Sequence, residues 1–426
     1  MRSRAAVGFL IACGLASAQT AAAPSLLAPV NQRLPKWIKL TGELRAREEG
    51  FFGNHFTEGQ DDMYLLQRVR LGISLKPVRW FEAFAQGQDA RVSFQSKIQA
   101  APPYQDSADL RQAWVQFQAG PEKNHVTFRA GRQELGFGEE RLVGAGNWGN
   151  VSRTFDALRL GVRQGNYAAD VFAASVVVAR DHFFDKRYQG DNLHGAYGSI
   201  SGWVPGGKLE PFVFWRISPA GYNHKTAGLR WFGKLPAHLE YTTEMALQRG
   251  LRSGRDVRAW AGLWRLGRTF SDVKWTPSLK LEVNHASGDR DPNDNRYETF
   301  DLLYPTPHDK YGLTDQVGWK NINHFGVIGE IKPRKTLAVQ FKAHGWWLAS
   351  ARDGLYNAPG ALLARDATGQ SGRHVGEELD AQVIWNVRPG VQFTGGLGHL
   401  FPGEFLKRTT PGRGYTFPYV GMLYGF

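Results

Sequence analysis

The sequence predicts an all-β protein, a transmembrane antiparallel β-barrel of about 18 strands. Three observations lead to this prediction. Apolar and polar residues alternate with period two in many segments along the chain, which is the pattern of strands with one apolar face. Short turns alternate with long polar loops between these segments, as in membrane barrels, whose periplasmic turns are short and whose external loops are long. The chain also opens with a secretory pattern, so we expect it to leave the cytoplasm.

Residues 1–18 have the organisation of a signal peptide. Arg2 and Arg4 precede an apolar run that ends in the small-residue pattern Ala16-Ser17-Ala18. That run is too short to cross a bilayer as a helix. We therefore expect it to be removed, leaving residues 19–35 as a polar periplasmic lead and residues 36–426 as the outer-membrane barrel.

The single cysteine, Cys13, lies inside the expected signal peptide. After cleavage the mature protein would have no thiol, disulfide or thiolate metal site. Acylation of Cys13, as in a lipoprotein, is the alternative interpretation of the same residues.

The first predicted strand, residues 37–48, illustrates the alternation. Ile38, Leu40 and Leu44 fall on one face, whereas Lys39 and Arg45 fall on the other. In a membrane barrel the apolar face meets lipid and the charged face lines the lumen. The same pattern recurs in about eighteen segments, centred near residues 42, 70, 86, 114, 130, 159, 172, 198, 213, 230, 243, 261, 282, 327, 341, 382, 395 and 421.

Connections between these segments fall into two classes. Turns rich in Pro, Gly and Asn are short: they lie at 76–79, 163–166, 204–207, 234–236, 332–335 and 387–390. The long polar loops, which we expect outside the cell, are 49–62, 92–109, 136–152, 179–192, 286–321, 349–375 and 400–415. The last segment, 416–426, alternates and ends in an aromatic residue, typical of a closing strand that the outer-membrane insertion machinery reads.

Composition narrows the class of partner. The formal net charge is +13, which suits nucleic acid, a polyanionic ligand or an anionic membrane face. Export from the cytoplasm argues against nucleic acid. We expect outer-membrane lipid around the barrel and an anionic ligand within it.

No residues form a catalytic constellation, so we do not expect an enzyme. The twelve His are scattered singly without a metal-ligand spacing. Residues 144–149 match a dinucleotide fingerprint by letters but lack the helix that must follow. We expect no cofactor and no metal; the one candidate is calcium on the loop carrying Asp289, Asp291 and Asp294, which we interpret as a solvated surface loop.

The functional signal is the charge on the predicted lumen face. Rings of Arg and Lys draw anions into a pore, and the planar guanidinium suits carboxylates. Across the first six strands, strand parity turns these basic residues inward: Lys39, Arg45, Arg47, Arg68, Arg70, Arg129, Arg153 and Arg159. Acids share that face, namely Glu43, Glu82, Glu240, Glu282 and Asp380, so a wall of paired charges without a binding role is the alternative.

Residues 131–160 carry a family resemblance. The succession Gly131-Arg132-Gln133, Arg141-Leu142-Val143-Gly144, Asn147-Trp148 and Arg153-Thr154-Phe155-Asp156-Ala157-Leu158-Arg159-Leu160 resembles the alginate-export family of outer-membrane β-barrels. The resemblance implies an electropositive channel through which a uronate polymer passes, with Arg132, Arg153 and Arg159 among its lining residues. Arg132 has the parity of a lipid-facing residue, so its role requires a bulge at Gly131 or a strand that has already left the hydrocarbon.

From these observations we predict an outer-membrane channel that passively conducts an anionic, alginate-like polysaccharide. The expected pore-lining set is Arg45, Arg47, Arg68, Arg70, Arg129, Arg132, Arg153 and Arg159. Periplasmic export proteins are further candidate partners. Two alternatives remain: a general or uptake porin for small anionic solutes, and a secreted all-β enzyme that degrades polysaccharide.

Overall fold

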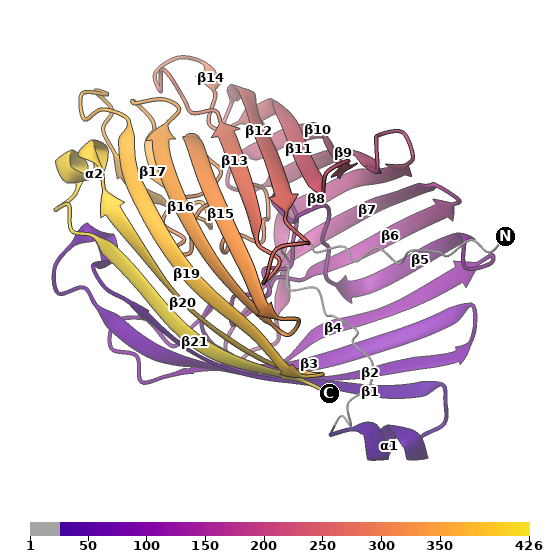
Figure 1. The fold of residues 1–426 in the computed structure, drawn as a ribbon. Coiled ribbons are helices and arrows are strands. Elements are labelled where there is room, and N and C mark those ends of the chain that lie inside the picture. Colours follow the sequence, from indigo (N-terminus) through magenta and orange to yellow (C-terminus); the bar gives the residue numbers. More distant parts are fainter. Residues whose placement is uncertain (1–25) are drawn as a thin grey trace.

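Residues 26–426 of the computed structural model are described here; the expected signal peptide, residues 1–18 with Cys13, lies outside them. Eighteen antiparallel strands close into one barrel (Figure 1). The first nine are β1 (Ile38–Phe51), β2 (Asp62–Val78), β3 (Phe81–Ser93), β4 (Asp106–Ala119), β5 (Asn124–Gln133), β6 (Phe155–Gln164), β7 (Tyr167–Val178), β8 (Lys186–Ser201) and β9 (Gly207–Ser218). The others are β10 (Tyr222–Leu235), β11 (Leu239–Arg252), β12 (Arg255–Thr269), β13 (Ser278–Ala286), β15 (Ile322–Arg334), β16 (Leu337–Leu348), β19 (His374–Arg388), β20 (Val391–Pro402) and β21 (Tyr415–Gly425).

Short elements decorate the two ends of the barrel. Helix α1 (Ala28–Arg33) precedes β1 at the end that also holds the C-terminus (Figure 1). The other end carries the 3-10 helix η1 (Asn54–Phe56), β14 (Arg296–Tyr297), the hairpin of β17 (Gly354–Tyr356) and β18 (Leu362–Arg365), and α2 (Glu404–Thr409). Among residues 26–426, no helix is long and apolar enough to cross a membrane.

The barrel closes where β1 pairs with β21, from Glu43 opposite Gly425 to Glu49 opposite Tyr419. The Gly42 N–H donates to the Phe426 carbonyl at 2.6 Å. A Cβ atom at Gly42 would lie 2.1 Å from the Phe426 ring, so glycine is what allows the last aromatic ring to cross β1. Closure leaves the barrel without a free sheet edge.

Strand parity separates two faces, as the sequence predicts. Outward side chains are apolar and exposed, for example Leu71 at 56%, Leu158 at 54% and Leu379 at 57%. Their inward neighbours are polar, and Arg129 lies directly opposite Arg159 across the β5–β6 pair. The eighteen predicted centres all fall within the eighteen barrel strands, so the predicted fold class is confirmed.

One expectation is wrong: two of the long loops do not stay outside. Residues 134–154, between β5 and β6, and residues 298–321, between β14 and β15, fold into the lumen, where they contact inward-facing side chains on many strands. We call them the first and second inner loops. Their buried apolar side chains pack together inside the barrel; they include Leu135, Phe137, Leu142, Val143, Phe300, Leu302, Leu313 and Trp319. Burial of this apolar area favours the inward position.

Candidate functional site

The two inner loops are joined to each other by backbone hydrogen bonds. The Gly144 N–H donates to the Tyr304 carbonyl, and the Tyr304 N–H donates to the Leu142 carbonyl, both at 2.8 Å. The Thr306 N–H donates to the Glu140 carbonyl at 2.9 Å. These bonds satisfy backbone groups that the lumen would otherwise leave unpaired, so the loops form one constriction across the barrel.

Arginines of β1 hold the first inner loop from one side. The Arg45 guanidinium donates to the carbonyl oxygens of Asn147, Trp148 and Gly149 at 2.9–3.0 Å. Arg47 donates to the Trp148 carbonyl at 2.8 Å, and its guanidinium carbon lies 3.7 Å from the centre of the Trp148 ring. Four of these contacts therefore join a cation to a neutral carbonyl acceptor.

Arginines of β2 continue the same contact surface. Arg68 donates to the Gly149 carbonyl at 2.9 Å and forms an ion pair with Glu43 at 2.6 Å. Arg70 donates to the Ser152 hydroxyl at 2.6 Å and to the Asn147 side-chain oxygen at 3.1 Å. We call Arg45, Arg47, Arg68 and Arg70 the arginine ladder.

Asn150 locks the tip of the first inner loop against the wall. Its amide group donates to the carbonyls of Gln67, Arg91 and Tyr104 at 2.8–3.3 Å, and its side-chain oxygen accepts from Arg45 at 3.1 Å. Only 1% of Asn150 is exposed. An amide is the side chain that supplies both donors and an acceptor at one point.

On the opposite wall, Glu139 of the first inner loop lies among three guanidinium groups. It forms ion pairs with Arg265 of β12, with Arg230 of β10 at 3.3 Å and with Arg141 at 3.5 Å. Burial opposes ionisation of Glu139, but the charges of Arg265, Arg141 and Arg230 prevail and hold its pKa well below the ordinary value. Glu139 therefore stays a carboxylate and anchors the loop.

The second inner loop is anchored by other wall residues. Arg216 of β9 pairs with Asp301 at 2.9 Å, and Lys342 of β16 pairs with Asp309 at 2.5 Å. His308 stacks on Trp148 with ring centres 3.7 Å apart. The Trp148 ring thus lies between Arg47 and the second inner loop.

The remaining predicted site residues fall into three places. Arg153 belongs to the first inner loop instead of the strand expected for it, and it donates to the carbonyls of Gly144 and Pro305. Arg129 and Arg159 lie on the wall, where Arg129 is 3.8 Å from the Trp114 ring and Arg159 pairs with Asp170 at 3.0 Å.

Arg132 lies apart from the others. Gly131 has a φ of +125°, but Arg132 still pairs with Asp156 at 2.9 Å, and Asp156 shares its parity with the exposed Leu158 and Leu160. The irregularity at Gly131 therefore does not bring Arg132 to the arginine ladder. Its position is near the outer end of β5, on the outward side.

Several basic residues of the constriction were missed from the sequence. Arg111 is the extra residue of a bulge in β4, where Gln86 pairs with Gln112 and Gly87 with Leu110. It pairs with Glu134 and points inward with its neighbour Gln112, which simple alternation cannot predict. Strand parity extended beyond the sixth strand would have found Arg230 and Arg265.

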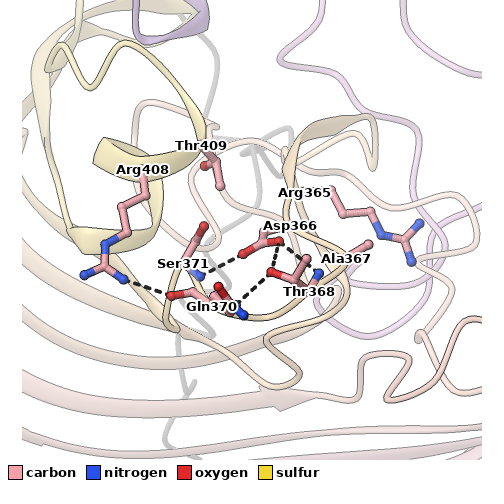
Figure 2. Close-up of a pocket in the computed structure, with 8 residues that line it drawn as sticks. All are labelled: Arg365, Asp366, Ala367, Thr368, Gln370, Ser371, Arg408 and Thr409. Atoms are coloured by element: carbon pink, nitrogen blue, oxygen red, sulfur yellow. Dashed lines mark hydrogen bonds between the residues drawn. The ribbon is translucent and has the colours of Figure 1, made fainter.

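Two further polar sites lie outside the constriction. On the loop weighed above as a calcium candidate, Asp289 is buried and pairs with Arg255 at 2.9 Å, whereas Asp291 and Asp294 accept hydrogen bonds from nearby backbone N–H groups. Figure 2 shows a hollow at the rim between residues 365–371 and α2. The dashed lines mark hydrogen bonds among the lining residues themselves, so these residues stabilise the rim and do not belong to the pore.

The constriction suits one kind of chemistry. Guanidinium groups bound to neutral carbonyls can exchange those partners for carboxylates, because hydrogen bonds between two charged groups are stronger. The ladder residues are buried in this arrangement, at 3–8% exposure. An anion would therefore reach them only when the first inner loop moves.

Comparison with known proteins identifies relatives of this architecture. The family model described as "Alginate export" matches residues 36–417. No curated protein matches the chain. Among solved structures, OccD3 (OpdP) of Pseudomonas aeruginosa has a TM-score of 0.62 at 10% identity, with 92% of each chain covered. OprD of the same organism has 0.60 at 10% identity, covering 91% of this chain and 93% of that one, and Acinetobacter baumannii OccAB2 has 0.60 at 11%, covering 91% and 98%. At these identities the likeness concerns the fold alone.

Proposed function

The chain belongs to the alginate-export family and is an outer-membrane channel, and from this premise we propose that it passively conducts an anionic, uronate-bearing polysaccharide out of the periplasm. The family and the closed barrel indicate a channel rather than an enzyme.

One observation carries the proposal: the arginine ladder binds neutral carbonyl oxygens of the first inner loop. Arg45 alone makes three such bonds. A uronate carboxylate offers the same guanidinium a charged acceptor. The loop carbonyls therefore occupy the guanidinium groups until uronate carboxylates displace them. As the polymer advances, its carboxylates bind the arginines of the ladder one after another.

Conduction also requires weak binding at each step. Sites in a conducting pore must attract an ion yet release it to the next site. Arg68 and Arg159 keep their own carboxylate partners, Glu43 and Asp170. These acids lower the net attraction at each position, so a passing uronate is held only loosely.

Reversal potentials of single channels in a KCl gradient test the proposal. We expect anion selectivity in the wild type and a marked loss of it in the double variant Arg129→Glu/Arg159→Glu. Arg132→Glu makes one such charge change, half that of the double variant, on the outward side; it is the control, and its selectivity should stay unchanged. Cation selectivity in the wild type, or equal effects of the double variant and the control, would contradict the proposal.

The alternative, a porin for small anionic solutes, is favoured by the inner loops that cross the lumen. Oligouronates distinguish the two functions. A polymer channel is blocked by oligouronates in a length- and voltage-dependent manner, whereas neutral oligosaccharides of equal length block it less. A small-anion porin passes monomeric uronate and shows no dependence of block on chain length.

A further inference from the structure

A cluster of three carboxylates lies away from the constriction, at the outer end of the barrel. Asp106 and Asp109 lie among the first four residues of strand β4, and Asp185 is the last residue of the loop before β8. One carboxylate oxygen of each residue lies within 4.8 Å of the corresponding oxygens of the other two. Oxygens that share one Ca²⁺ at 2.3–2.6 Å are at most about 5 Å apart, so this spacing matches a calcium site.

Asp106 provides an independent observation. Only 2% of the residue is exposed, and its Oδ1 atom has no hydrogen-bond partner among the described residues. A buried carboxylate oxygen without a donor is costly. A cation at the centre of the cluster would satisfy it.

Neighbouring cations are engaged elsewhere. Among the ion pairs of residues 26–426, none involves Asp106, Asp109 or Asp185. Arg132, the nearby guanidinium, pairs with the Asp156 carboxylate and donates to the backbone carbonyl of Asp185 at 3.0 Å. Arg132 attracts Asp109 and Asp185 without forming an ion pair with either, so three carboxylates share one guanidinium that is already paired with Asp156.

Backbone donors hold the cluster in shape without neutralising it. The Asp185 N–H donates to Asp109 at 2.8 Å, and the Arg180 N–H donates to Asp185 at 2.7 Å. Each carboxylate oxygen has a second lone pair for a metal ion. These bonds preorganise the oxygens and already bring residues 179–185 against β4.

We propose that Asp106, Asp109 and Asp185 form a calcium site that fastens the 179–185 loop to the outer end of β4. Hard carboxylate oxygens in an irregular arrangement suit Ca²⁺ better than Mg²⁺, which demands a stricter octahedron. The site is independent of polymer transport. Its expected effect is to hold residues 179–185 in place at the outer rim of the barrel.

Calorimetric titration of CaCl₂ into the folded, EGTA-treated barrel in detergent at pH 7.5 tests the site. We expect one saturable site whose affinity falls about tenfold or more in Asp106→Asn and in Asp185→Asn, since ligand charge sets calcium affinity. Asp89→Asn is the matched control. Asp89 lies near Asp106 but pairs with Arg91 at 2.7 Å, and we expect its loss to change the affinity less than about threefold.

Two further readouts keep the test decisive. Heat-modifiable migration in gels shows that each variant is folded, and Asp185→Asn, a loop substitution, serves if Asp106→Asn fails to fold. Ca²⁺ should also protect the bond after Arg180 from trypsin in the wild type and not in Asp185→Asn. Absence of saturable binding by the folded wild type, or equal losses in Asp89→Asn and Asp106→Asn, would overturn the proposal.

Discussion

At the scale of single residues, the constriction depends on side chains that each make several hydrogen bonds. Asn150, only 1% exposed, makes four hydrogen bonds, three to barrel strands and one to Tyr104 in the loop before β4. Replacing its amide with a carboxylate of the same shape would set a negative charge against three carbonyl oxygens. The loss of stability would come from the new charge and the lost N–H donors, because Asn and Asp have nearly the same volume. The position is therefore a sensitive probe of how the inner loop is held.

We predict that Asn150→Asp loosens the first inner loop by about 2–4 kcal/mol. The expected results are higher single-channel conductance and faster proteolysis of residues 134–154 in the folded barrel. Asn166→Asp, in the exposed turn between β6 and β7, introduces the same charge and should change neither. Identical conductance of the wild type and Asn150→Asp would show that the loop is not held by this residue.

A second prediction concerns Glu139 and pH. Its pKa is lower in the folded protein than the ordinary value, because Arg265, Arg141 and Arg230 outweigh the effect of burial. Such a carboxylate stabilises the fold above its ordinary pKa of about 4.3 and loses that contribution as the pH falls through the lower folded value. The anchor should thus hold at neutral pH and weaken below about pH 4.

Single-channel conductance measured between pH 7 and pH 3.5 checks this expectation. Glu139→Gln should raise conductance already at pH 7, because three guanidinium groups then lose a shared carboxylate. Glu240→Gln, which neutralises an acid paired with Lys280 near the start of β11, is the control. Equal conductance of Glu139→Gln and the wild type at pH 7 would contradict the prediction.

At the scale of elements, Trp148 couples the two inner loops. Its ring lies 3.7 Å from the Arg47 guanidinium carbon and 3.7 Å from the His308 ring. We predict that Trp148→Ala lets the loops move separately and increases current fluctuations between conductance levels. Trp385→Ala removes an outward-facing ring of β19 that is 42% exposed and should leave the current trace unchanged. A quiet trace in Trp148→Ala would argue against coupling.

The elements also show what the sequence can and cannot reveal. Period-two alternation located every barrel strand, because each strand such as β19 has one face in lipid, with Leu379 and Val383 exposed outward. Arg111 was missed because its bulge breaks the alternation locally. The inward position of the first inner loop was missed because loops have no period. Its apolar residues, Phe137 among them, were the available signal.

At the scale of the whole molecule, the barrel and the inner loops are held by different forces. The strands are joined by backbone hydrogen bonds around a closed ring, from β1 through to β21 and back. The loops are held by side chains of the wall, such as Arg45 of β1 and Arg265 of β12, which pairs with Glu139 of the first inner loop. A barrel in lipid must satisfy its own backbone regardless of what fills it, so the wall should persist when the loop is removed.

We therefore predict that replacing residues 137–150 with a short Gly- and Asn-containing turn yields a barrel that still folds and remains heat-modifiable. Conductance should rise at least about twofold, because an 18-stranded barrel is wide enough for an aqueous channel. Anion selectivity should increase as well. The replacement removes Glu139 and Glu140 with only one cation, Arg141, and it frees the arginine ladder from its carbonyl partners.

Reversal potential and oligouronate block measured on the same preparation distinguish this outcome from simple widening. A merely wider pore would show weaker selectivity and weaker block, since its walls lie farther from the ion. Unmasked ladder arginines instead give stronger selectivity and tighter uronate block in spite of the greater width. Shortening residues 366–371 at the rim (Figure 2) is the control for loop removal as such. Weaker selectivity in the 137–150 replacement would mean that the ladder serves only to hold the loop.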